Sequence, residues 1–164
     1  MFHIVLVEPE IPQNTGNIAR TCAATGCHLH LVRPLGFEIS DRQLKRAGLD
    51  YWHLVNVQVH DSLEEVFALY PEANAYFFTT KARKTYADVH YREGDLLVFG
   101  KETKGLDEEL LVAHADSCVR IPMREESRSL NLSNAAAVAV FEALRQNGFR
   151  GLSEAGDLHR LKWE

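Results

Sequence analysis

A glycine-bracketed loop in the middle of the chain has the character of a ligand-binding turn. Leu97-Val98-Phe99 is typical of the end of a buried strand, and Gly100-Lys101-Glu102-Thr103-Lys104-Gly105 follows it directly. A loop that leaves the carboxyl end of a strand is where open α/β sheets bind ligands. The two glycines allow a ligand to approach the backbone closely. We therefore expect a binding site at this loop.

The same loop has the glycine spacing of a P-loop but lacks its chemistry. Leu106 and Asp107 stand where a P-loop carries the Lys and the Ser or Thr that reach phosphates and magnesium. The sequence therefore argues against binding of a nucleoside triphosphate.

Two other polar segments could complete a site. Upstream, we interpret Asn14-Thr15-Gly16-Asn17 as a turn and helix cap, with Arg20 about one turn into the helix. Amide groups at a helix N-terminus and a nearby guanidinium suit an RNA phosphate. Downstream, Ile121-Pro122-Met123 and the segment 127–134 carry more side-chain oxygens than one helix cap needs. The alternatives are an ordinary surface arginine and a plain strand end.

The order and content of these three segments resemble the motifs of the SPOUT (SpoU–TrmD) RNA methyltransferases, from the first strand to about Gln146. The stretches 8–14 and 44–51 are most similar to the TrmL/YibK type of tRNA methyltransferase. The resemblance implies methyl transfer from S-adenosylmethionine to the ribose 2′-hydroxyl of a wobble cytidine or modified uridine in the anticodon stem-loop of certain tRNAs. S-adenosylhomocysteine would be the product. The alternatives are another tRNA or rRNA site, and a cofactor- or RNA-binding module without catalysis.

The resemblance also implies roles for individual residues. Arg20 would clamp an RNA phosphate and stabilise the developing alkoxide, with a role as base as the alternative, and Asn17 would support it. Ser129 and Asn131 would orient the ribose or the cofactor. Glu102 would either fix its loop or lie near the cationic methyl donor. The cofactor contacts are expected at Phe78, Thr79, Gly100, Glu102, Gly105, Ile121, Met123, Ser129 and Leu130.

The hydrophobic pattern predicts an α/β fold with a mainly parallel sheet and helices on both faces. A chain of 164 residues suits one domain, which we place at 1–150, followed by a polar tail at 151–164. The resemblance alone adds a C-terminal trefoil knot. Strands are expected near 2–7, 28–33, 54–59, 74–79, 95–99 and 117–121, and helices near 16–25, 41–47, 61–70, 107–114 and 132–147.

The last predicted helix is apolar around its whole circumference over Ala135–Phe141. A helix of this kind must be buried on more than one side. Because it comes near the end of a small domain, the simplest second partner is another subunit. We therefore expect a homodimer that uses the helix at 132–147.

Charge and composition limit the other possibilities. The net charge is −5, which disfavours a general nucleic-acid binder, although lysines and arginines gather in the loops described above. Tyr51, Trp52 and Tyr86 could stack on unpaired bases, or could pack inside the protein. Cys22, Cys27 and the neighbouring histidines lack a second ligand pair, so no metal is expected. No apolar run is long enough to span a membrane, and we expect a cytoplasmic protein.

Overall fold

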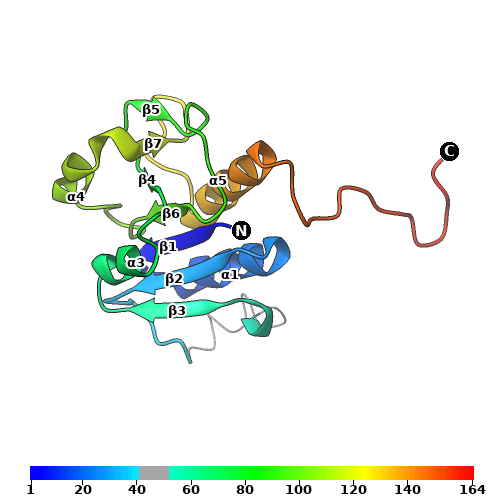
Figure 1. Cartoon of the computed structure of the whole chain (residues 1–164), viewed down its shortest axis with the longest axis horizontal. Helices are drawn as coiled ribbons and strands as arrows, with labels where there is room; N and C mark the ends of the chain where they lie inside the picture. Colours follow the sequence, from blue (N-terminus) through cyan, green and yellow to red (C-terminus); the bar gives the residue numbers. More distant parts are fainter. Residues whose placement is uncertain (41–51) are drawn as a thin grey trace.

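The fold is built on one seven-stranded parallel sheet, whose strands follow one another from bottom to top in the computed structural model of Figure 1, which describes residues 1–40 and 52–164. Every strand pairs in parallel with its neighbours, in the order β3-β2-β1-β6-β4-β7-β5. The strands are β1 His3–Val7, β2 His28–Val32, β3 Val57–His60, β4 Ala75–Phe78, β5 Lys84–Thr85, β6 Leu96–Phe99 and β7 Cys118–Arg120.

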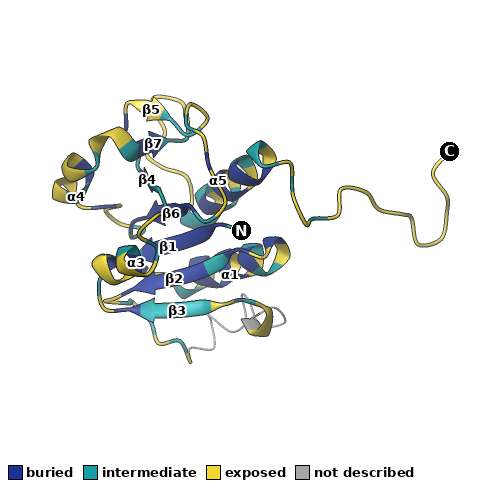
Figure 2. Ribbon diagram, in the orientation of Figure 1, coloured by how far each residue is buried: buried dark blue, intermediate teal, exposed yellow. Residues whose placement is uncertain are grey.

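Side chains that alternate along the strands bury apolar surface on both faces. In β1, Ile4 and Leu6 belong to the core under α1 and α5, whereas Val5 belongs to the core under α3 and α4. Parallel sheets require cover on both faces, and the central strands are accordingly the most buried part of the ribbon (Figure 2). The helices are α1 Pro12–Thr25, α3 Leu63–Leu69, α4 Glu108–Ala113 and α5 Leu132–Gln146.

The predicted fold class is confirmed, and most predicted elements lie within a few residues of their expected places. The two-residue strand β5 was missed because it is too short to show a hydrophobic period. β3 begins at Val57 because a 3₁₀ turn occupies Trp52–Leu54. The predicted helix at 41–47 lies outside the described residues. The trefoil knot stays a prediction.

One predicted boundary was wrong in a way that affects the site. Helix α1 begins at Pro12, so Asn14-Thr15-Gly16-Asn17 is helical and does not form a turn or a cap. Proline is favoured in the first helical turn because its ring fixes φ and its missing N–H has no intrahelical partner there. Ile11 occupies the cap position, and its side chain cannot cap the helix.

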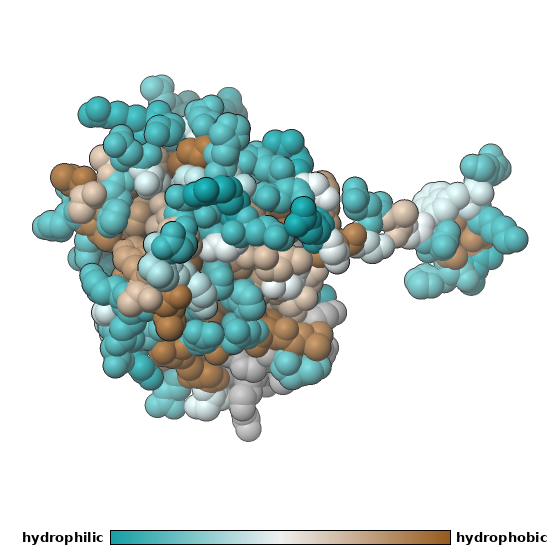
Figure 3. Space-filling view, viewed as in Figure 1, coloured by the Kyte–Doolittle hydropathy of each residue, from teal (hydrophilic) through white to brown (hydrophobic). Residues whose placement is uncertain are grey.

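Helix α5 is the longest helix in the described part of the chain. It buries Ala136, Ala139, Val140, Ala143 and Leu144 against the sheet and α1. The tail beyond it extends away from the body and is mostly hydrophilic (Figure 3). None of the described helices combines the length and the hydrophobicity needed to cross a bilayer.

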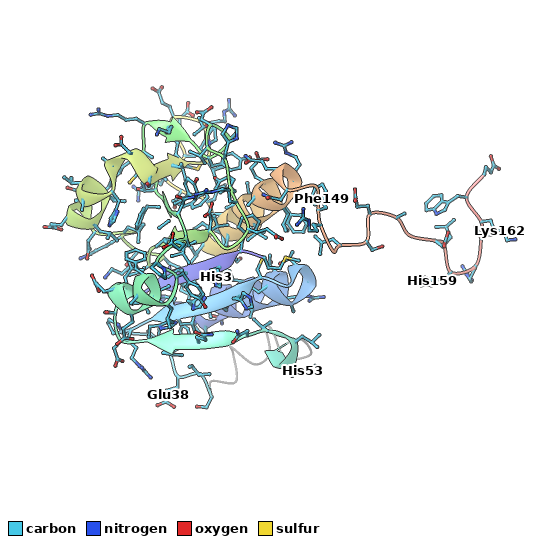
Figure 4. The ribbon with its side chains drawn as sticks, viewed as in Figure 1. His3, Glu38, His53, Phe149, His159 and Lys162 are labelled. Atoms are coloured by element: carbon cyan, nitrogen blue, oxygen red, sulfur yellow. The ribbon has the colours of Figure 1, made fainter. Side chains whose placement is uncertain are left out.

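Three histidines form a hydrogen-bonded row across the face under α3. His3 Nδ1 lies 2.9 Å from His30 Nε2, and His30 Nδ1 lies 3.0 Å from His60 Nε2. All three side chains are buried, and the Tyr70 ring packs on His3. Figure 4 labels His3 on β1. Burial, reinforced by the neighbouring imidazoles, lowers the pKa of His3 from 6.5 to about 4 and that of His30 to about 3.

This row predicts acid sensitivity. Because the folded-state pKa values lie below the unfolded value, the stabilisation is complete above about pH 6.5 and is lost as the pH falls toward 4. Between pH 7.5 and 5, each imidazole kept neutral should lower the free energy of unfolding by up to about 2 kcal/mol. Urea unfolding at both pH values measures this loss.

The matched variants for this measurement are His30→Gln, which removes the central imidazole, and His159→Gln on the exposed tail. The first should shrink the difference between the two pH values, and the second should leave it unchanged. An equal pH dependence in all three proteins would contradict the assignment.

Candidate functional site

A pocket of about 470 Å³ lies where β6, β4 and β7 end side by side. The loops that follow these strands and the first turns of α1 and α5 form its wall. The described lining residues are Ile11, Asn14, Phe78, Thr79, Thr80, Lys81, Phe99, Gly100, Lys101, Glu102, Thr103, Lys104, Gly105, Ile121, Met123, Arg128, Ser129, Leu130, Asn131, Leu132 and Ala135.

The loop after β6 closes on its own backbone. Gly105 N–H donates to the Lys101 carbonyl at 2.8 Å, and the two residues form an isolated antiparallel bridge. A Cβ atom on Gly100 would lie 2.1 Å from the Gly105 carbonyl carbon, so only glycine fits there. Gly105 has φ +71°, a conformation that also favours glycine. The glycines therefore serve to pack the loop onto itself and leave its backbone open to the pocket.

Aromatic and aliphatic side chains form the inner wall. The rings of Phe78 and Phe99, at the ends of β4 and β6, stack with centroids 4.7 Å apart. Ile121, Met123 and Leu130 add apolar surface from the chain that follows β7. A mostly apolar wall with a few polar groups is typical of a small-molecule site.

The Glu102 carboxylate joins this loop to the start of α1. It accepts hydrogen bonds from the backbone N–H of Glu10 at 2.8 Å, from that of Ile11 at 3.0 Å and from Asn14 Nδ2 at 3.2 Å. A carboxylate at a helix N-terminus satisfies free amide groups and interacts favourably with the helix dipole. Of the two roles considered for Glu102, the geometry shows the first: it fixes its loop.

Two further pairs of residues join the same two segments, with the donors now in the loop after β6 and the carboxylates in the segment before α1. Glu10 accepts hydrogen bonds from Thr103 N–H at 3.1 Å and from Thr103 Oγ1 at 3.0 Å. Lys101 Nζ forms an ion pair with Glu8. The hydrogen bond to Glu8 raises the pKa of Lys101 above its ordinary value, so this lysine stays charged at neutral pH.

Asn14 connects the third loop to the other two. Its Oδ1 accepts a hydrogen bond from Asn131 Nδ2 at 2.9 Å, while its Nδ2 donates to Glu102. Asn131 Oδ1 in turn accepts from the backbone N–H groups of Ser133 and Asn134 and caps α5. The chain Glu102–Asn14–Asn131 therefore ties the first turns of two helices to the loop after β6.

The structure brings all nine expected cofactor contacts to this one pocket, and Ser129 lies among them. Asn17 and Arg20 are not on its wall; both are exposed on the outer side of α1. The sequence analysis predicted a turn at Asn14 and did not predict that this residue lines the pocket and connects its loops. The one signal for this role in the sequence was the position of Asn14, six residues before Arg20.

Of the predicted base-stacking residues Tyr51, Trp52 and Tyr86, only the side chain of Tyr86 is among those that the structure describes. Tyr86 is partly buried and packs against the core, and Tyr51 lies outside the described residues. Across residues 1–40 and 52–164, no group of three or more His, Cys, Asp or Glu side chains could hold a metal ion. Cys22 and Cys27 are buried and unbonded, on and just after α1.

Comparison with known proteins identifies the family to which this chain belongs. The model of the SpoU rRNA Methylase family matches residues 1–141. The tRNA (cytidine(34)-2′-O)-methyltransferases of Methylovorus glucosotrophus and Saccharophagus degradans are 51% and 52% identical over 152 residues, covering 92% of this chain and 99% of each relative. The chain belongs to the SpoU rRNA methylase family, whose members depend on S-adenosylmethionine.

Solved structures resemble the chain closely. One, described as giving structural insights into the 2-OH methylation of C/U34 on tRNA, has a TM-score of 0.87 at 48% identity and covers 92% of this chain and 98% of its own. A SpoU methyltransferase from Streptomyces viridochromogenes, in complex with AdoMet, has a TM-score of 0.79 at 24% identity over 88% of this chain and 57% of its own. At that identity the second shows the shared fold alone.

The pocket suits S-adenosylmethionine by its chemistry. Open backbone groups around Gly100 and Gly105 can bind the adenine, and the apolar wall can surround the methionine chain. The cofactor has no phosphate, which agrees with the absence of P-loop lysine and serine from this loop.

Loss of the Glu102 carboxylate should weaken both the fold and the site. Glu102→Ala leaves two backbone N–H groups and Asn14 without their acceptor, and should lower the free energy of unfolding by about 1–2 kcal/mol. Cofactor affinity should fall as well, because the loop loses its anchor. Urea unfolding and calorimetric titration with S-adenosylmethionine measure the two effects.

The control is Glu109→Ala, which removes an exposed carboxylate from the first turn of α4. Its free energy of unfolding should change by less than about 0.5 kcal/mol. The anchoring role is wrong if Glu102→Ala behaves like this control in both measurements.

Proposed function

We propose that this chain is an S-adenosylmethionine-dependent methyltransferase that acts on the ribose 2′-hydroxyl of the wobble nucleotide, position 34, of tRNA. The observation that carries the proposal is the pocket that gathers all nine expected cofactor contacts in a chain half identical to tRNA (cytidine(34)-2′-O)-methyltransferases along nearly its whole length. A tRNA substrate would place the enzyme in the cytoplasm.

The residues of the pocket act by alignment. S-adenosylmethionine, when bound, supplies a methyl group that is already activated for displacement. The apolar wall at Phe78, Ile121 and Leu130 would exclude water from a bound cofactor. Ser129 and Asn131 line the same pocket from the loop before α5, where they can orient a ribose. Alignment of reacting groups can lower a barrier by about 7–11 kcal/mol in favourable cases.

Arg20 is the residue that we assign to the phosphate and the developing alkoxide, with Asn17 one turn before it as its support. A guanidinium with a pKa above about 12 is a poor base in water, so its first role is positional and electrostatic. A role as base, with the phosphate assisting, is the alternative.

The decisive assay is methyl transfer from labelled S-adenosylmethionine to tRNA from a strain that lacks this enzyme. The wild-type protein should label a 2′-O-methylpyrimidine at position 34. Arg20→Ala should lower kcat/KM by at least about 100-fold while leaving cofactor affinity unchanged, because Arg20 lies off the pocket wall.

Label at another position would replace the wobble assignment with another RNA site. Binding of cofactor and RNA without any product would favour a binding module. Wild-type turnover in Arg20→Ala would remove Arg20 from the mechanism.

We further propose that the enzyme is a homodimer formed through α5. On its outer side, α5 exposes Val138 and Phe141 to the extent of 38% and 48%. Asn17 and Arg20 are exposed on α1, which packs against α5 on the same face of the sheet. Association through α5 would therefore cover the apolar stripe and set Arg20 at the subunit interface.

We infer that Arg20 serves the pocket of the partner subunit, since it does not line the pocket of its own chain. A hybrid dimer tests this inference. One subunit carries Arg20→Ala, and the other carries Leu130→Arg, which adds a positive charge to the pocket against a cationic cofactor. Leu130 is 41% exposed, so the fold should tolerate the change.

Each parent dimer should be inactive, and the purified hybrid should regain about half of the wild-type activity, because one of its two sites is intact. An inactive hybrid would show that Arg20 acts within its own chain. A monomer in solution would exclude the shared site altogether.

A further inference from the structure

The wall of the cofactor pocket carries more positively charged side chains than the single carboxylate of the cofactor could pair with. Four of its described side chains are cationic, namely Lys81, Lys101, Lys104 and Arg128, and one, Glu102, is anionic. S-adenosylmethionine itself is a net cation at neutral pH, with a sulfonium and an ammonium group against one carboxylate. Like charges at such short range repel one another.

Two of the four cations are neutralised by the protein. Lys81 Nζ lies 2.9 Å from Glu108 Oε1, and this contact lowers the pKa of the Glu108 carboxyl. Lys101 is paired with Glu8. These two lysines hold the loops after β4 and β6 in place, and their charges are neutralised by the carboxylates of Glu108 and Glu8.

The other two cations have no such role. Lys104 and Arg128 are both exposed, and within residues 1–40 and 52–164 neither forms an ion pair with a carboxylate. They come from different loops, one after β6 and the other after β7, and both line the same pocket. Their exposure leaves both head groups accessible to a ligand that approaches the pocket from solvent.

We propose that Lys104 and Arg128 bind the backbone phosphates next to the target nucleotide and so hold its 2′-hydroxyl at the pocket. The proposal rests on the proposed function, because it takes RNA as the anion. RNA presents one phosphate per nucleotide, and a guanidinium binds phosphate through two parallel hydrogen bonds whereas an ammonium acts as a point charge. An enzyme with a net charge of −5 gains local attraction for RNA at the one place where chemistry requires it.

The test is the binding of a tRNA anticodon stem-loop to Lys104→Gln, Arg128→Gln and the double variant over a range of salt concentrations. Removal of each phosphate-binding side chain should reduce the slope of log K against log salt by about 0.7–0.9. Arg128→Gln should weaken RNA binding by about tenfold at moderate salt. In steady-state assays the KM for RNA should rise more than kcat falls.

The matched controls are Lys162→Gln and Arg160→Gln, which remove the same charges from exposed positions of the tail. Figure 4 labels Lys162 on this tail, which extends away from the body. These variants should keep the wild-type slope and activity. Calorimetric titration should give a cofactor affinity no weaker than that of the wild type for every variant, and thermal unfolding should give the same midpoint, which separates the removal of an RNA-binding group from damage to the fold.

Two results would overturn the proposal. An unchanged salt slope in the double variant would mean that neither residue touches phosphate. A decrease in cofactor affinity would assign the charges to the cofactor carboxylate. Because RNA binding is measured without turnover, a reduced slope together with label at a site other than position 34 would leave the clamp standing and refute only the wobble assignment.

Discussion

The carboxylate of Glu102 is the contact on which the arrangement of the site depends. It lies in the loop after β6, yet its oxygens accept from the backbone N–H groups of Glu10 and Ile11, directly before α1 and more than ninety residues earlier in the chain. Through Asn14 and Asn131 the same network reaches the cap of α5. The pocket is therefore formed by two helix starts and one loop that share their polar groups, and none of the three is placed by its own sequence alone.

Local pattern was enough to predict six of the seven strands of the sheet. The runs Ile4–Val7 and Leu96–Phe99 are apolar on successive residues, as strands buried on both faces must be, and both lie at its centre. Once the strands were placed, the loops after β4, β6 and β7 had to meet at one edge, because parallel neighbours end together. The resemblance to a known family indicated which residues of these loops to expect at the cofactor, and in the structure those residues line one pocket.

The start of α1 could not be predicted because no local side chain caps it. A search for a capping side chain finds Asn14 and stops there, whereas the helix starts at Pro12 without a side-chain cap, and the chain just before it is held by Glu102. Asn17 and Arg20 lie on the outer side of this helix, off the pocket wall. The apolar circumference of α5 led to the prediction of a second subunit, but no spacing within one chain records which residue would reach a pocket across an interface.

The self-closing turn between Gly100 and Gly105 has an evolutionary consequence. A ring closed by its own backbone cannot gain or lose a residue without breaking both the bridge and the close approach at Gly100. Substrate preference in enzymes built on this turn must therefore diverge through substitution at solvent-facing positions such as Lys104, while the number of residues in the turn stays constant.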